Sequence, residues 1–306
     1  MSNYDELLDE NRKLKFEIYT LRKEIEDLKS NISTSIDNKK QINNHSTNIK
    51  STLEEKIKLY RSLFYGRCDV FALRFDNESK NKHGYKPYCM NEWKHGICNK
   101  SEIKCSDCDF RKFKVLEDTD VLEHLSGKKT IGLYPLLPND KCKFLAIDFD
   151  GNSWQKDSLL VVDTFNEFNI STSMERSRSG YGCHLWIFFN EEISAKTARY
   201  FGTLILNYTL KNNVGLNLGS YDRLFPNQDK MPKGGFGNLI ALPLQRIPAK
   251  NKNSLFVDTN FEYYKDQWEY LSNVKRITLT EINTVIELLE IELKSSLSIN
   301  SQKFRT

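Results

Sequence analysis

Residues 144–151 read Phe-Leu-Ala-Ile-Asp-Phe-Asp-Gly, an apolar run that ends in two carboxylates. The run has the length of a buried β-strand. Side chains two positions apart in a strand project from one face, so we expect Asp148 and Asp150 side by side and Phe149 in the core. Adjacent carboxylates repel one another, and a divalent cation, which prefers oxygen ligands, relieves that repulsion. The alternative is a carboxylate pair that only solvates a strand end.

The segments around this strand predict a core of mixed secondary structure. We expect helices at 53–64, 121–125, 158–168, 194–212 and 279–295, and further strands at 68–75, 131–137, 183–189 and 237–244. Helices that alternate with strands favour an α/β or α+β fold. The 306 residues are 39% hydrophobic and 28% charged, which is typical of a folded globular protein, and the net charge of +4 permits a nucleic-acid partner without requiring one.

A glycine-bearing turn precedes the apolar strand expected at 183–189. Ser179 and Gly180 lie in this turn, Arg176 and Arg178 precede them, and His184 stands at the head of the strand. Glycine lets a backbone approach a phosphate closely, and arginine adds positive charge, so the segment is typical of a nucleotide-phosphate site. The alternative is a core histidine with two unrelated arginines.

A third acidic segment, residues 219–245, contains Asp222 and a glycine-rich stretch with Lys230 and Lys233. Asp222 is a candidate third carboxylate for a metal site that Asp148 and Asp150 begin. The lysines and glycines form a basic loop suited to phosphates. The alternative is a glycine-rich hairpin with solvated lysines.

Four of the seven cysteines lie within one short segment. Four thiolates close a tetrahedral zinc shell, which predicts a structural zinc site. His95 is a possible replacement ligand, an iron–sulfur cluster is an alternative on ligand type, and the remaining possibility is a loop of unligated cysteines. The four candidate ligands are Cys89, Cys98, Cys105 and Cys108, whereas Cys68, Cys142 and Cys183 read as buried thiols.

The N-terminal residues follow a heptad pattern. Leucine occupies each d position, and Asn11 occupies one a position among isoleucines, a combination that favours a parallel dimeric coiled coil. The alternative is a single amphipathic helix packed on its own domain. The repeat comprises Leu7, Asn11, Leu14, Ile18, Leu21, Ile25 and Leu28. The predicted organisation is a coiled-coil helix at 1–30, a flexible linker at 31–52, a main domain at 53–290 with a zinc module within 84–113, and a tail at 291–306.

Several segments together resemble one known family. Asp-Phe-Asp at 148–150, Ser-Gly-Tyr-Gly-Cys-His at 179–184 and Tyr-Asp-Arg-Leu-Phe-Pro-Asn-Gln at 221–228 resemble the motifs of the archaeo-eukaryotic primases. Gly-Tyr-Lys-Pro-Tyr-Cys-Met-Asn-Glu-Trp at 84–93 and Gly-Phe-Gly-Asn-Leu-Ile-Ala-Leu-Pro-Leu-Gln at 235–245 look like the primase domain of TOTE conflict systems, and CRISPR-associated primase-polymerases are similar. The resemblance implies an α+β primase-polymerase fold, with an RRM-like catalytic sheet and an N-terminal α/β unit.

The resemblance also implies an activity and roles for individual residues. The activity is that of a nucleotidyltransferase, a primase-polymerase that joins nucleoside triphosphates on a DNA template or primer. Asp148, Asp150 and Asp222 match the acids that hold Mg²⁺ or Mn²⁺, and His184 with Ser179 matches a nucleotide-contacting motif. The four clustered cysteines match zinc ligands. Lys230, Lys233 and Gln245 match loop residues near nucleotide or template.

The expected setting follows from the same resemblance. TOTE proteins often continue into a helicase and a nuclease, so we expect those activities, where needed, from a separate polypeptide in a defence system. We expect a cytoplasmic protein, without a membrane helix or secretory signal, that pairs as a homodimer through its N-terminal helix. Two other functions stay open: a catalytically inactive nucleic-acid-binding adaptor and a metal-dependent nuclease.

Overall fold

The computed structural model describes residues 46–77, 79, 81–213 and 217–303, with side chains as far as residue 294, together with Leu14 and Leu21. Two compact units divide the chain: Thr47–Leu279 is one, and Met1–Ser46 with Thr280–Thr306 is the other. The predicted coiled coil lies outside the described residues except for Leu14 and Leu21, which are helical. Across the described residues, no helix combines the length and apolarity needed to cross a membrane.

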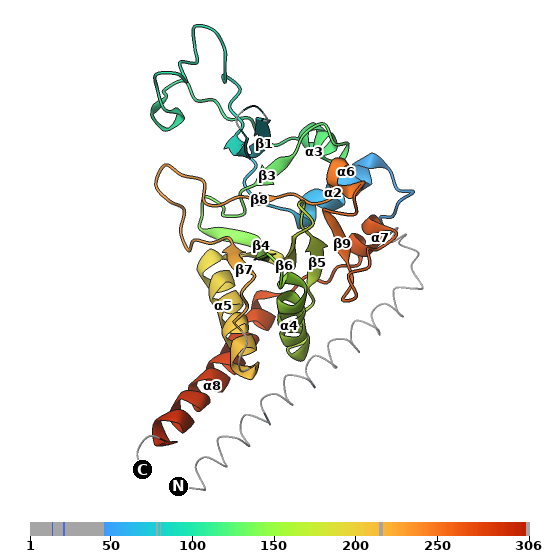
Figure 1. Cartoon of the computed structure of the whole chain (residues 1–306), viewed down its shortest axis with the longest axis vertical. Helices are drawn as coiled ribbons and strands as arrows, with labels where there is room; N and C mark the ends of the chain where they lie inside the picture. Colours follow the sequence, from blue (N-terminus) through green and yellow to red (C-terminus); the bar gives the residue numbers. More distant parts are fainter. Residues whose placement is uncertain are drawn as a thin grey trace. The chain divides into compact units, whose positions relative to one another are not determined.

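The larger unit is built from two antiparallel sheets and the helices that accompany them (Figure 1). Its elements, in chain order, are α2 (Leu53–Leu63), β1 (Ala72–Asn77), β2 (Lys82–Pro87), η2 (Cys105–Asp107), α3 (Asp118–Leu125), β3 (Ile131–Leu133), β4 (Lys141–Asp150), α4 (Trp154–Glu167), β5 (Ser173–Arg176), β6 (Gly182–Ser194), α5 (Ala195–Asn212), β7 (Tyr221–Phe225), β8 (Ile240–Ala241), α6 (Arg246–Ala249), β9 (Leu255–Val257) and α7 (Gln267–Ser272). Helix α8 (Leu279–Lys303) follows.

The five-stranded sheet has the order β7-β4-β6-β5-β9. Its first four strands arise from the chain order β4-α4-β5-β6-α5-β7, which is the split β-α-β arrangement of RRM-like folds, with β9 added at one edge. Helices α4 and α5 pack against each other and against β4 and β6. The close approach of α5 depends on Gly202, because a Cβ there would lie 2.8 Å from Leu145 Cδ2. The sheet therefore has the strand order expected of an RRM-like sheet.

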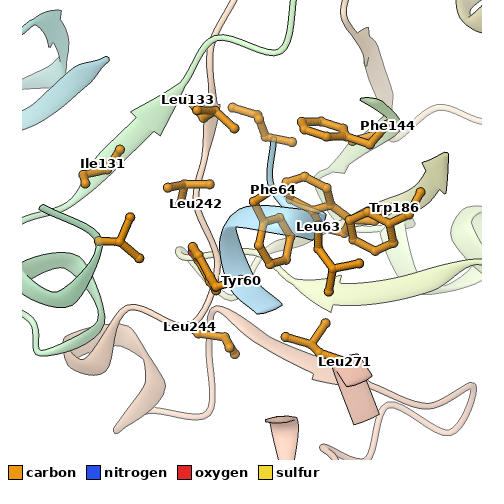
Figure 2. Close-up of a cluster of buried hydrophobic side chains, with 14 of the residues drawn as sticks. Tyr60, Leu63, Phe64, Ile131, Leu133, Phe144, Trp186, Leu242, Leu244 and Leu271 are labelled. Carbon is orange, nitrogen blue, oxygen red and sulfur yellow. The ribbon is translucent and has the colours of Figure 1, made fainter. Parts of the chain in front are cut away.

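The four-stranded sheet has the order β2-β1-β3-β8; its first three strands, like α2 and α3, come from the N-terminal part of this unit, and β8 comes from a later segment. Thr52 begins α2 with a capping box that Glu55 completes. Tyr60, Leu63 and Phe64 then enter a cluster that joins side chains of both sheets, as Figure 2 shows. The Phe64 ring meets the Trp186 ring edge-on, with centroids 5.0 Å apart. This shared core covers the face of the five-stranded sheet that α4 and α5 leave free.

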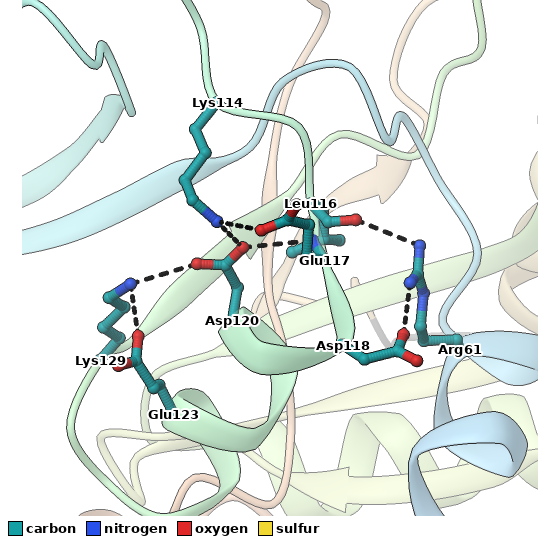
Figure 3. Close-up of polar contacts among 8 residues, drawn as sticks. All are labelled: Arg61, Lys114, Leu116, Glu117, Asp118, Asp120, Glu123 and Lys129. Carbon is teal, nitrogen blue, oxygen red and sulfur yellow. Dashed lines mark hydrogen bonds and ion pairs between the residues drawn. The ribbon is translucent and has the colours of Figure 1, made fainter. Parts of the chain in front are cut away.

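Helix α3 is held by buried and surface charges (Figure 3). Asp120 is 1% exposed and accepts from both Lys114 and Lys129, so its carboxylate is paired on two sides. Arg61 of α2 binds Asp118 and ties the two helices together. The acidic first turn that contains Asp118 and Asp120 explains why the helix begins before residue 121, where apolar periodicity alone placed it.

The predicted elements differ from the structure chiefly in strand length. Strands predicted at 131–137 and 237–244 are Ile131–Leu133 and Ile240–Ala241. Leu136, Leu137 and Leu242 are buried although they lie outside strands, so apolar character reports burial there without regular pairing. Strand β1 begins four residues later than the predicted start at residue 68. Strands β2, β5, β7 and β9 were not predicted.

Candidate active site

Asp148 and Asp150 lie at the C-terminal end of β4, on one face of the sheet. Asp148 pairs with His184 of β6, and Asp150 pairs with Gly182. Asp148 is buried and Asp150 is exposed, so the pair spans the border between core and solvent. Phe149 is fully buried on the opposite face of the strand, as its position in the alternation predicts. The pair therefore has the geometry expected from the sequence.

Asp222 joins these carboxylates through an irregularity in β7. Asp148 pairs with Arg223 and Phe149 pairs with Tyr221, so Asp222 is an extra residue in the ladder. Such a bulge re-aims a side chain that regular alternation would turn to the opposite face. One carboxylate oxygen from each of Asp148, Asp150 and Asp222 lies within 4.8 Å of the others. These three residues, the acid cluster, have the spacing and donor type that suit a divalent cation.

A buried aspartate of α4 fixes the start of β7. Asp157 Oδ2 accepts hydrogen bonds from the backbone N–H of Ser220 at 3.0 Å, from the Ser220 hydroxyl at 2.7 Å and from the Ser153 hydroxyl at 2.8 Å. The Ser220 carbonyl in turn accepts from the backbone N–H of Asp150 at 2.7 Å. Asp157 thereby sets the position of Asp222 relative to Asp150 although it lies outside the acid cluster.

His184 connects the acid cluster to the buried sheet. Its Nε2 lies 3.4 Å from Asp148 Oδ1, and its Nδ1 lies 2.7 Å from Glu175 Oε2. Glu175 is 1% exposed, and the same oxygen accepts from Trp186 Nε1 at 3.1 Å. Its other oxygen lies 3.4 Å from the Ser254 hydroxyl. The imidazole is thus held between two carboxylates, one buried and one at the cluster.

The electrostatics of the site are those of crowded carboxylates. Burial, partly offset by His184, raises the pKa of Asp148 to about 6, and the charges of Asp150 and Asp222 add to the rise. Burial alone would lower the pKa of His184, but Glu175 and then Asp148 and Asp150 raise it to about 9. A bound cation would supply the positive charge that the three acids lack.

The glycine-bearing turn lies against the acid cluster. The Tyr181 carbonyl accepts from the backbone N–H of Gly151 at 3.1 Å. Gly180 adopts a φ of +81°, which favours glycine. The Arg176 guanidinium donates to the Gly180 carbonyl from Nε and Nη2, so Arg176 shapes the turn. Ser179 Oγ likewise accepts from a backbone N–H within the turn.

The remaining cations differ in how fully they are engaged. Arg178 is half-buried, and its Nε is a buried donor without a hydrogen-bond partner among the described residues. Arg223 donates from Nε to Asp222 Oδ2 at 2.6 Å and remains 45% exposed at its side chain. Lys230 and Lys233 are exposed on the loop after β7. Arg223 therefore lies at the acid cluster with an exposed side chain, and Arg178 keeps one donor that the described residues leave unused.

Gln245, by contrast, is a structural residue. It is 2% exposed, accepts from the Ile247 backbone N–H and donates to the Lys129 carbonyl and to Thr130. These bonds cap α6 and tie it to the segment before β3. The sequence placed Gln245 near nucleotide or template, and in the structure both ends of its amide are engaged within the protein.

The four clustered cysteines line one cavity of about 430 Å³. Ile97, Phe113 and Phe236 also line it, so the loop after β7 packs against the segment that carries the cysteines. Within the described part of the chain, the acid cluster is the one group of potential metal ligands with atoms within 4.8 Å of one another, so the four sulfurs are not drawn together to that degree. Cys142 and Cys183 are buried as expected, whereas Cys68 is exposed.

Sequence reasoning missed Glu175, Asp157 and Arg223. Glu175 was detectable, because strand pairing runs outward from the turn: Arg176 opposes Cys183, and Glu175 opposes His184. In an antiparallel pair, residues at equal distances from the connecting turn oppose one another, and this rule identifies Glu175 as the partner of His184. Arg223 adjoins Asp222 in the sequence, but its pairing with Asp148 joins two segments that lie far apart along the chain.

Comparison with known proteins identifies a matching family. A solved structure of the polymerase domain of ligase D from Mycobacterium tuberculosis, in complex with DNA, is similar at 13% sequence identity and a TM-score of 0.35, over 77% of this chain and 88% of that chain. None of the curated proteins compared with the chain matches it. The model of the archaeo-eukaryotic primase domain of the TOTE conflict system matches residues 55–285, which is most of the chain, and the chain belongs to this family.

Proposed function

We propose that this protein joins nucleoside triphosphates on a DNA template by metal-dependent nucleotidyl transfer. Membership of the primase family supports nucleotidyl transfer in general. The observation that carries the specific proposal is the convergence of Asp148, Asp150 and Asp222, which are distant in sequence, within 4.8 Å at one sheet end. An adaptor without catalysis has no need of this cluster, since crowded carboxylates cost stability.

The acid cluster fits divalent cations by donor type and by spacing. Asp148, Asp150 and Asp222 would hold Mg²⁺ or Mn²⁺, and such a cation would lower the pKa of an attacking hydroxyl and offset the charge of a pyrophosphate leaving group. Arg223 keeps Asp222 aimed at the cluster through its 2.6 Å hydrogen bond. His184 and Arg178 bind the triphosphate in this proposal, and the Gly180 turn allows its close approach.

We further propose zinc for the four cysteines. Thiols that line one cavity provide the donor set of a structural zinc site, which holds four sulfurs in a tetrahedral shell. This cysteine module, Cys89–Phe113, exposes Trp93 by 70% and places Lys100 Nζ 5.1 Å from its ring centroid. An exposed aromatic ring beside a cation is typical of stacking sites for single-stranded nucleic acid, so we assign the module to template or primer contact.

The proposed setting retains the expectations from the heptad pattern. A homodimer forms through residues 1–30, and a separate helicase or nuclease acts with the primase in defence. The cytoplasm is the proposed compartment, because reducing conditions keep the cysteines free for metal.

A primer-extension assay tests the proposed function. Wild-type protein with a primed DNA template, Mn²⁺ or Mg²⁺ and labelled triphosphates is expected to lengthen the primer, and an unprimed template with each nucleotide type defines initiation and sugar preference. The double variant Asp148→Ala/Asp150→Ala is expected to abolish incorporation and to keep its fold by circular dichroism. Shortening of the primer would instead indicate a nuclease, and binding without either change would indicate an adaptor.

A further inference from the structure

A buried glutamate beneath His184 has no part in metal binding or in the proposed chemistry. Glu175 lies in β5 with 1% of its surface exposed, opposite His184 in the β5–β6 ladder. Its carboxylate is 2.7 Å from His184 Nδ1. A buried carboxylate is costly unless its hydrogen bonds are satisfied, so the retention of one here needs an explanation from the local geometry.

The two oxygens of Glu175 have different partners. Oε2 accepts from the His184 ring and from Trp186 Nε1, so both ring donors converge on one atom. Oε1 faces the Ser254 hydroxyl at 3.4 Å, a group that is able to donate or accept. Ser254 itself is fixed, because its backbone N–H donates to the Arg176 carbonyl at 2.8 Å. The carboxylate therefore has one orientation.

The orientation of Glu175 determines that of His184. Nδ1 is engaged below the ring, so Nε2 is the nitrogen that faces Asp148, at 3.4 Å. The terminal torsion of an imidazole is broad and roughly two-fold, so without the Nδ1 bond the ring loses the contact that selects one of its orientations. Hydrogen bonds to one ring nitrogen commonly fix the direction of the other.

We propose that Glu175 is a positioning residue, which holds the His184 ring so that Nε2 points to the acid cluster and to the phosphates of a nucleotide bound there. This inference rests on the proposed function for its ligand, but the position of the ring is testable without catalysis. Loss of the Glu175 hydrogen bond releases the ring and weakens nucleotide binding. It leaves the acid cluster and its cations in place.

The arrangement supplies an isosteric test variant. In Glu175→Gln, the amide oxygen replaces Oε2 and accepts from both rings, while the amide NH₂ replaces Oε1 and donates to the Ser254 hydroxyl. Ring position is then retained and the charge is removed. Glu175→Ala removes the acceptor altogether. Asp120→Asn is the matched control, because Asp120 is also a buried carboxylate with paired partners and lies in α3, outside the acid cluster.

The first measurement is the NMR signal of His184 Nδ1–H in full-length protein labelled with ¹⁵N-histidine. The protein has five histidines, and comparison with His184→Gln assigns the signal. We expect a signal protected from exchange in wild type, Glu175→Gln and Asp120→Asn, and its loss in Glu175→Ala. A protected signal in Glu175→Ala would overturn the proposal. Since no nucleotide is present, this result is independent of the proposed function.

The second measurement is KM for nucleotide and kcat in primer extension. We expect Glu175→Ala to raise KM about tenfold or more, with little change in kcat. This size corresponds to the loss of one hydrogen bond to a charged group. Glu175→Gln and Asp120→Asn keep KM near wild type. A Glu175→Gln variant as impaired as His184→Ala would overturn positioning, and this arm remains decisive if Glu175→Ala does not fold. Absence of extension by wild type would refute the proposed function alone.

Discussion

Gly182→Ala is a steric test of the acid cluster. Gly182 opposes Asp150 across the β4–β6 ladder. A Cβ at this position would lie 2.2 Å from the Phe149 carbonyl oxygen and 2.4 Å from Asp150 Oδ1. Unbonded carbon and oxygen approach no closer than about 3.3 Å, so one of the strands must move by about 1 Å. Because this oxygen belongs to the backbone, no side-chain rotation relieves the contact.

The size of the effect follows from this displacement. Overpacking of a filled site typically costs about 1–3 kcal/mol, which lowers Tm by several degrees. A reacting group displaced by about 1 Å loses on the order of a hundredfold in rate. We therefore expect Gly182→Ala to fold with a reduced Tm and to lose about 99% of nucleotide incorporation.

Gly202→Ala separates stability from site geometry. Its Cβ would lie 2.8 Å from Leu145 Cδ2, on the side of the same sheet that α5 covers, so it also overpacks the unit. We expect a comparable fall in Tm by differential scanning calorimetry, with incorporation within about threefold of wild type per mole of folded protein. Equal activity losses in the two variants, or an active Gly182→Ala, would show that the Gly182 contact does not position the acid cluster.

Three further predictions concern other parts of the unit. Burial lowers the pKa of His124 to about 4, and its ring accepts from Ile131 N–H and donates to the Pro243 carbonyl. Between about pH 6.5 and pH 4, the unfolded chain therefore binds this proton and the folded chain does not, so the free energy of unfolding falls by about 3 kcal/mol as the pH falls through this range. In urea titrations, the free energy of unfolding of His124→Gln should depend less on pH than that of wild type, and an equal dependence would contradict this. Asp157→Ala leaves Ser220 N–H unpaired, and we expect a loss of about 1–3 kcal/mol with weaker Mn²⁺ binding; unchanged Mn²⁺ affinity would count against the anchoring role. Cys105→Ser should reduce zinc from one per chain, measured by elemental analysis, and lower Tm; equal zinc in both proteins would exclude Cys105 as a ligand.

The sequence predicted the site where local periodicity carries the information. Strand alternation alone places Asp148 and Asp150 on one face and Phe149 in the core, and the structure has that arrangement. Asp222 was named as the carboxylate of a third segment and from the family motif, without an argument from periodicity. Its convergence with the other acids depends on a β-bulge, which the periodicity of the sequence does not predict.

Contacts between distant segments account for what was missed. Asp157 acts through Ser220, 63 residues further along the chain, and nothing near it in the sequence marks that partner. Strand β9 joins the sheet edge beside β5 through only three residues, which is too short for a period to emerge. The strand predicted at 131–137 was too long, because Leu136 and Leu137 are buried by tertiary packing outside a ladder.

The central claim is that carboxylates from two strands form one cation site. Titration of the full-length protein with Mn²⁺, followed by electron paramagnetic resonance of the free ion, measures this without any nucleotide. The account predicts binding in wild type and its loss in both Asp148→Ala/Asp150→Ala and Asp222→Ala, since all three acids contribute ligands. Wild-type affinity in Asp222→Ala, with a folded protein, would contradict it.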